Sequence, residues 1–385
     1  MAEEVLKNVL EWCFNNTNIL SARDNANNGD RLIHFAAEKG YVSVVKQLLE
    51  KGVSPDIKCD INYTPLHYAA KEGHAEVAKL LLDNGANPNS IGGDNETPIF
   101  LATEKGHEEV VTLLIQNGAN VDCLNFDDDE TPLRRAALEG HLEIAKILIE
   151  NGAEIESKDK EKLTPLMIST VNRNPEMVTL LIQNGANVNS LNCNDNWTPL
   201  HMAANEGHLE IAKMLIENGA EIDSKDKDKF TPLHLSAKAG HVELTRLLIQ
   251  NGAEVDCQNI DLNTPLILAS LNEHFEIAKV LLENEANVHE GDLYGFSALH
   301  VAAGCNQTHI AELLIEKGAD VNAKSADLFT PLHFSSEMNN VETSLILLQS
   351  GASLIDKDEK SNNAMESSLE INRIEVFKAI VAFQH

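Results

Sequence analysis

The chain has 385 residues, of which 43% are hydrophobic and only 4% aromatic, so its core must be built mainly from Leu, Ile, Val and Ala. Its formal net charge of -30 argues against binding to nucleic-acid backbones or anionic membranes, because such surfaces need clustered Lys and Arg. The acidic excess favours a monomer that its charge keeps soluble, or a protein partner with a basic patch.

The cysteines and the N-terminal residues indicate a cellular compartment. Six cysteines stand far apart, without CxxC pairs or zinc-finger spacing, so neither a disulfide framework nor a metal site is expected. The first residues are acidic where a signal peptide is basic, and no apolar run approaches the roughly 18 residues of a membrane span. These features predict a cytoplasmic protein with neither a signal peptide nor a transmembrane segment.

In chain order, the first expected element is an amphipathic helix over residues 3–14, and we assign residues 1–27 to an N-terminal cap. Ten repeats then fill residues 28–360, and residues 361–385 form a C-terminal capping partial repeat. The anchor steps are 33 residues, except for 34 from Thr97 to Thr131 and from Thr164 to Thr198. The anchors, mostly Thr-Pro, lie at positions 31, 64, 97, 131, 164, 198, 231, 264, 297 and 330.

The repeat at Thr64 shows why each unit forms two short helices. Thr64 can cap the first helix with its hydroxyl, and Pro65 suits the first helical position, where a missing N–H costs nothing. Gly73 supplies the left-handed turn that ends this helix, and Gly85 ends the second helix. The Asn-, Asp- and Gly-rich residues before Thr97 predict a hairpin loop, called a finger below. Helices this short need stacked neighbours to persist.

Three recurring motifs carry a resemblance to a known family. They are Thr-Pro-Leu-His at 64, 198, 231 and 330, Gly-His at 73, 106, 140, 207 and 240, and Asn-Gly-Ala after most second helices. Over residues 28–385 the chain resembles the ankyrin repeat family. The resemblance implies an all-α repeat solenoid of helix-turn-helix units with β-hairpin loops. It also implies a concave surface that binds proteins, and it brings no catalytic residues and no cofactor.

A second period of 67 residues indicates a tandem duplication, so differences between repeats are more informative than similarities. Three departures stand out: Arg134-Arg135 replaces His-Xaa, residues 171–175 lose Gly-His, and Glu285 replaces a helix-ending Gly. These departures reflect either sequence drift in a tolerant repeat or a local distortion that fits a partner. The repeat at Thr164 is the best candidate for such a distortion.

Fifteen histidines could suggest metal binding or catalysis, but most recur at two fixed positions of the repeat. Recurrence indicates a structural role, and in similar proteins such histidines bond neighbouring loops and caps. No P-loop, GxSxG, HExxH or paired CxxC motif is present in the sequence. We therefore predict no catalytic residue, no cofactor and no metal.

The residue before each anchor Thr or Ser lies at the base of a finger, which in ankyrin-like proteins faces the partner. Five of the 17 aromatic residues of the chain stand at this position: Tyr63, Trp197, Phe230, Phe296 and Phe329. Aromatic rings bury a large area with few rotatable bonds, so they are good interface anchors. The alternative is that each ring packs against the neighbouring finger.

One finger with an inserted residue carries four consecutive carboxylates, Asp127, Asp128, Asp129 and Glu130. They form a solvated tip or contact a basic partner; the spacing does not suit a calcium-binding loop of the EF-hand type. The predicted partner-binding residues are therefore the five aromatic residues, these four carboxylates, and Arg134 and Arg135, which depart from the repeat pattern.

These features predict a non-enzymatic scaffold or adaptor that holds a protein partner on its concave surface. An alternative is an ankyrin effector that a host-associated microbe secretes to capture a host protein. A regulatory variant of this hypothesis is that asparagines of the fingers are hydroxylated, as they can be in similar arrays. Asn189 and Asn322 stand at the matching loop position. An enzyme would need an unrecognised site formed across repeats.

Overall fold

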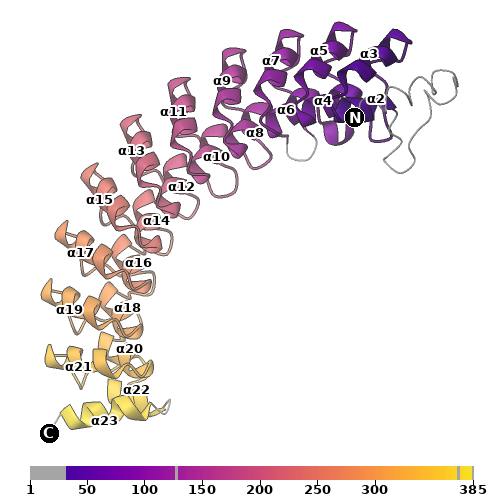
Figure 1. The fold of residues 1–385 in the computed structure, drawn as a ribbon. Helices are drawn as coiled ribbons and strands as arrows, with labels where there is room; N and C mark the ends of the chain where they lie inside the picture. The colour runs from indigo at the N-terminus through magenta and orange to yellow at the C-terminus, as the bar shows by residue number, and fades with distance from the viewer. Residues whose placement is uncertain (1–31, 126–128, 371–372, 384–385) are drawn as a thin grey trace. The chain divides into compact units, whose positions relative to one another are not determined.

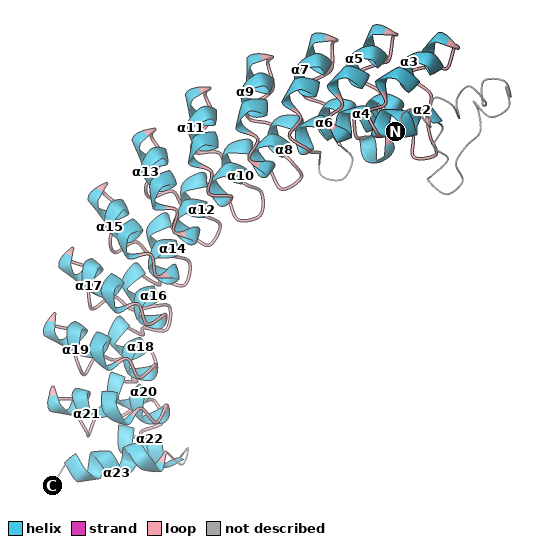
Figure 2. Ribbon diagram, in the orientation of Figure 1, coloured by secondary structure: helices cyan, strands magenta, loops and turns pink. Residues whose placement is uncertain are grey.

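The computed structural model describes residues 32–125, 129–370 and 373–383. The predicted capping helix of residues 1–27 lies outside these ranges. Within them the chain is helical and the fingers are loops, and strand pairing is limited to one isolated antiparallel bridge between Gly291 and Ser297 (Figure 2). The all-helical repeat architecture is thus confirmed, while the described fingers have almost none of the strand character expected of β-hairpins.

The chain divides into two compact units, Met1–Asn187 and Val188–His385. In the first unit, helices follow one another in pairs, and a short 3₁₀ helix, η1 (Gly93–Asn95), lies in one finger. The first helices of the pairs are α2 (Leu32–Glu38), α4 (Pro65–Glu72), α6 (Pro98–Glu104), α8 (Pro132–Glu139) and α10 (Pro165–Val171). The second helices are α3 (Val42–Glu50), α5 (Ala75–Asp83), α7 (Glu108–Gln116), α9 (Leu142–Glu150) and α11 (Pro175–Gln183).

The second unit repeats the same arrangement and ends with a pair that the sequence analysis assigned to the C-terminal cap. Its first helices are α12 (Pro199–Glu206), α14 (Pro232–Ala239), α16 (Pro265–Leu271), α18 (Ala298–Gly304), α20 (Pro331–Glu337) and α22 (Ala364–Glu370). Its second helices are α13 (Leu209–Glu217), α15 (Val242–Gln250), α17 (Phe275–Glu283), α19 (Thr308–Glu316), α21 (Val341–Gln349) and α23 (Ile374–Phe383).

Within each unit the helices form two rows. First helices pack on first helices of adjacent pairs, for example α4 on α6 and α14 on α16, and second helices form the other row (Figure 1). The fingers project from the row of first helices. Small side chains such as Ala136 and Ala137 are fully buried and let neighbouring helices approach closely. Because the helices are only seven to ten residues long, this packing is what stabilises them.

The helix ends follow the local pattern expected from the sequence. The Thr131 hydroxyl accepts the backbone N–H of Arg134 at the start of α8, and Gly140 ends this helix in the left-handed region (φ 77°). Glu285 replaces the glycine that follows most second helices, yet it keeps the left-handed backbone (φ 65°). The turn geometry is therefore imposed by the repeat rather than by the residue at this position.

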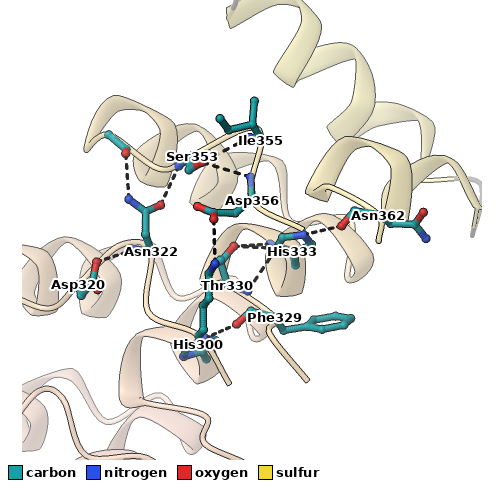
Figure 3. A network of polar contacts seen from close by, with 12 residues as sticks. His300, Asp320, Asn322, Phe329, Thr330, His333, Ser353, Ile355, Asp356 and Asn362 are labelled. Atoms are coloured by element: carbon teal, nitrogen blue, oxygen red, sulfur yellow. Dashed lines mark hydrogen bonds and ion pairs between the residues drawn. The ribbon is translucent and has the colours of Figure 1, made fainter. Parts of the chain in front are cut away.

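Buried histidines connect six of the described first helices to the next finger; they are His34, His67, His201, His234, His300 and His333. His333 accepts the Thr330 N–H at Nδ1 (3.2 Å), and its Nε2–H donates to the Asn362 carbonyl (3.1 Å) (Figure 3). His300 makes the matching bond to the Phe329 carbonyl (3.0 Å). Burial lowers the pKa of both imidazoles, so both rings are neutral at pH 7. These bonds hold the end of the finger, next to the following anchor residue, against the preceding first helix.

In the second unit the fingertips are also joined to one another by backbone hydrogen bonds of 2.8 to 3.0 Å, called the fingertip ladder below. In each bond, an N–H of one finger donates to a carbonyl of the finger before it. The pairs are Lys227 to Asp195, Ile260 to Asp228, Leu293 to Asp261, Ala326 to Tyr294 and Glu359 to Asp327. The tips of six consecutive fingers are therefore held at fixed spacing.

Candidate functional site

Three consecutive fingers of the second unit expose large apolar side chains at their tips. Ile260 is 54% exposed, Leu293 58% and Tyr294 63%, and Leu262 and Leu328 are also exposed. These five residues are called the fingertip ridge below. The fingertip ladder places them side by side. Exposed apolar residues that are gathered in one place usually mark a contact surface, whereas isolated ones need no explanation.

The charged residues within the three fingers of the fingertip ridge are of one sign. Fingers 259–263, 292–296 and 325–329 contain Asp261, Asp292 and Asp327 but no Lys or Arg. Asp292 is used internally, since its carboxylate accepts the N–H groups of Tyr294 and Phe296. Asp261 and Asp327 are exposed. The ridge is therefore an apolar surface with acidic residues between its apolar side chains.

Two of the predicted aromatic anchors lie below the fingertip ridge and are half-buried. The Phe296 ring stacks on Phe334 of α20, with centroids 5.1 Å apart and planes 6° apart. Phe329 packs against His333 at 5.6 Å. Both rings keep part of their surface accessible while contacting residues of their own unit, so their part in partner binding stays a prediction.

The other predicted aromatic anchors are more engaged in the scaffold. Tyr63 is only 7% exposed; its hydroxyl donates to Glu96 and its ring stacks on His67. The half-buried Trp197 donates its Nε1–H to the Asp226 carboxylate of the next finger (3.0 Å). Phe230 is half-buried, packing edge-on against His234 with the Lys238 ammonium 5.6 Å from its ring. The expected alternative, packing against a neighbouring finger, describes Tyr63 and Trp197 well.

The two predicted arginines are part of an ionic cluster in the first unit. Arg134 is 3% exposed and donates to the Asp159 carboxylate (2.5 Å) and, through Nε, to the Leu163 carbonyl (3.1 Å). The latter bond replaces the histidine bond that other repeats make to the next finger. Arg135 pairs with the buried Glu130 (2.6 Å). Arg134 and Glu130 are thus placed as internal supports.

Of the predicted acidic fingertip, Asp127 and Asp128 lie outside the described residues. Asp129 is exposed and has a left-handed backbone (φ 53°). Next to it, the Glu130 side chain points inward to Arg135. Among the described residues, these two neighbouring carboxylates therefore have different surroundings.

The asparagines at the hydroxylation-like position bridge adjacent repeats. Asn322 accepts the Ser353 N–H (2.8 Å) and donates to the Gly351 carbonyl (3.4 Å) (Figure 3). Asn189 makes the equivalent bonds to Glu221 (2.9 Å) and Gly219 (3.1 Å). In this conformation both side-chain amides are occupied by the next repeat.

Neither a cluster of metal-ligating side chains nor a membrane-crossing helix is found in the described part of the chain. Residues 32–125, 129–370 and 373–383 contain no group of three or more His, Cys, Asp or Glu side chains placed to hold a metal ion. No helix in those ranges combines the length and apolar character of a membrane crossing.

The exposed tips Leu293 and Tyr294 were missed by sequence reasoning, which looked for aromatic anchors only at the residue just before each anchor Thr or Ser. A signal was available, because apolar residues replace the usual Asn, Asp and Gly of these turns at Ile260, Leu262 and Leu328 as well. What the sequence could not show is that the fingertip ladder places these residues together.

Comparisons with known proteins agree with this architecture. A family model described as ankyrin repeats in three copies matches residues 2–92, 89–159, 155–226, 218–292 and 285–358. The chain is similar to the crystal structure of the human ASB11 ankyrin repeat domain, at 27% identity and a TM-score of 0.52, covering 58% of this chain and 99% of that one. No curated protein matches the chain. Ankyrin repeats are generally modules of protein–protein interaction. Because the family model covers most of the sequence, the chain belongs to the ankyrin repeat family.

Proposed function

We propose that this chain is a non-enzymatic scaffold that binds a protein partner on the fingertip ridge of the second unit. The observation that carries the proposal is the gathering of Ile260, Leu293 and Tyr294, each more than half exposed, on fingers fixed by backbone hydrogen bonds. A surface held rigid before binding loses little conformational entropy when a partner docks.

The charges indicate the chemistry of the partner. With Asp261 and Asp327 exposed beside the apolar tips and no basic residue in these three fingers, the ridge favours an apolar surface flanked by Lys or Arg. The half-buried rings of Phe296 and Phe329 add apolar area below the tips. Phe334, stacked on Phe296, extends this area onto α20.

The test replaces Leu293 and Tyr294 with Asp in the full chain used as bait for affinity capture, followed by mass spectrometry and affinity measurement. We expect binding of the captured partner to fall by about tenfold or more, because central apolar anchors dominate interface energies. Both side chains are exposed, so thermal stability should not change. Trp197 is unsuitable for this test because its bond to Asp226 also supports the scaffold.

The matched control is Ile91→Asp/Leu124→Asp, which places the same two charges on fingers of the first unit, at side chains that are about half exposed. It should leave capture unchanged. Equal loss in both proteins, or full binding by the Leu293→Asp/Tyr294→Asp protein, would show that the ridge is not the contact surface.

A further inference from the structure

A pocket of about 500 Å³ lies in the first unit, between α8, α10 and the finger that joins α9 to α10. Leu138, Leu163 and Ile168 supply aliphatic walls, and Leu138 is substantially exposed. The volume is large enough for one bulky side chain. The pocket is separate from the fingertip ridge, which belongs to the second unit.

The positive and negative groups that line this pocket are equal in number. Arg134 pairs with Asp159 (2.5 Å) and Arg135 with Glu130 (2.6 Å), and the exposed rim residues are one base, Lys160, and one acid. A charged guest would leave an excess charge in a partly buried site, or would have to displace an existing partner. Either event costs free energy, so the lining favours a neutral guest.

Arg135 also determines the shape of the favoured guest. Its guanidinium lies 5.4 Å from the centroid of the Phe100 ring, and its side chain is still partly exposed where it lines the pocket. A planar guanidinium stacks on aromatic faces, and aliphatic walls pack well against a ring. A flexible aliphatic guest would gain only the wall contacts.

We propose that this pocket binds a neutral aromatic side chain, of the tyrosine or tryptophan class, presented by a protein partner. This inference rests on the proposed scaffold function and adds a second contact point on the other unit. The ring would lie between Leu138 and Ile168, with the guanidinium of Arg135 against its face.

The test uses the full chain with ¹³C-labelled Leu and Ile methyl groups and the probe N-acetyl-tyrosinamide. We expect saturable shifts of the Leu138 and Ile168 methyl signals, with an affinity roughly fivefold higher than for N-acetyl-leucinamide, N-acetyl-argininamide or N-acetyl-glutamate amide. Arg135→Lys keeps the charge but loses the plane, so it should abolish this preference.

Leu138→Trp fills the pocket and should remove the binding. The matched control, Leu271→Trp, makes the same substitution at the corresponding exposed position of α16 and should leave it unchanged. Equal affinity for all four amides, tighter binding of a charged amide, or binding that survives Leu138→Trp would overturn the proposal. Because the probe is a single amino-acid amide, this result is independent of partner capture on the ridge.

Discussion

Gln307 shows how much one side chain matters at the start of a second helix. At this position of other repeats, His107, His241 and His274 donate through Nε2 to a carbonyl of the preceding repeat, at 3.0 to 3.1 Å. The Gln307 side chain is buried, and neither its Oε1 nor its Nε2 has a hydrogen-bond partner. The repeat thus loses a connection and buries two unsatisfied polar atoms.

Gln307→His should therefore raise the free energy of unfolding, by about 1 kcal/mol, by restoring the bond to the preceding repeat. The reciprocal change His274→Gln should lower it by a similar amount. Urea unfolding followed by circular dichroism measures both. A Gln307→His protein that is less stable than the parent would mean that the amide is better accommodated than its contacts indicate.

At the scale of the element, α8 carries a buried arginine that takes over a histidine's role. Arg134 bonds the Leu163 carbonyl as the histidines bond the next finger, and it also neutralises the largely buried Asp159. Removing one partner of a buried pair leaves an uncompensated charge, which costs more than the pair itself contributes.

We therefore expect Arg134→Ala to lower the free energy of unfolding by roughly 3–5 kcal/mol. Arg134→His, which restores the Thr-Pro-Leu-His motif, also removes the partner of Asp159, but it should cost about 1 kcal/mol less than Arg134→Ala because the bond to the Leu163 carbonyl can form again. Thermal and urea unfolding of the two proteins would test this. Equal losses would show that the ion pair, rather than the bond to the finger, is what α8 requires.

Helix boundaries were predictable because their causes are local. The Thr-Pro caps and the glycines after the helices determine where α8 and its equivalents begin and end. Contacts between elements were not predictable in the same way. In the sequence Arg134 is a departure from the pattern that was assigned to partner binding, and only packing against the next finger shows its contacts with Asp159 and Leu163.

Across the whole molecule, the buried histidines make stability depend on pH. Burial lowers the pKa of His67 and of His234 to about 4, and it lowers the pKa of His201, His300 and His333. Each ring uses Nδ1 to accept a backbone N–H and Nε2–H to donate to a carbonyl, as at His234. Only the neutral imidazole satisfies both bonds.

Because the folded-state pKa values are depressed, the stabilisation is complete above about pH 6.5 and decreases as the pH falls toward 4. At pH 5 the loss should reach roughly 2 kcal/mol for each of the two most strongly shifted histidines. The urea concentration at the midpoint of unfolding should therefore be lower at pH 5 than at pH 7.

His234→Gln should reduce this pH dependence, whereas His309→Gln, at a highly exposed side chain, should not. A midpoint that does not change between pH 7 and pH 5 would contradict the assignment of neutral, structurally required histidines.

The sequence was sufficient for the repeat architecture but only partly for the candidate site. The period is repeated many times, so drift at Glu285 does not hide it. The site depends on positions where the repeats differ, and a single sequence does not show whether such a side chain points outward, as Tyr294 does, or inward, as Glu130 does.

The fingertip ladder also limits how the second unit can change in length during evolution. Every donor lies 32 residues after its acceptor, from 227 and 195 to 359 and 327. Inserting or deleting a residue between two paired tips would break the bond that joins them. Both 34-residue steps in the chain end at or before Thr198, ahead of the first donor, and the steps after it are all 33. A segment joined in this way can lengthen without breaking its bonds only by copying whole repeats.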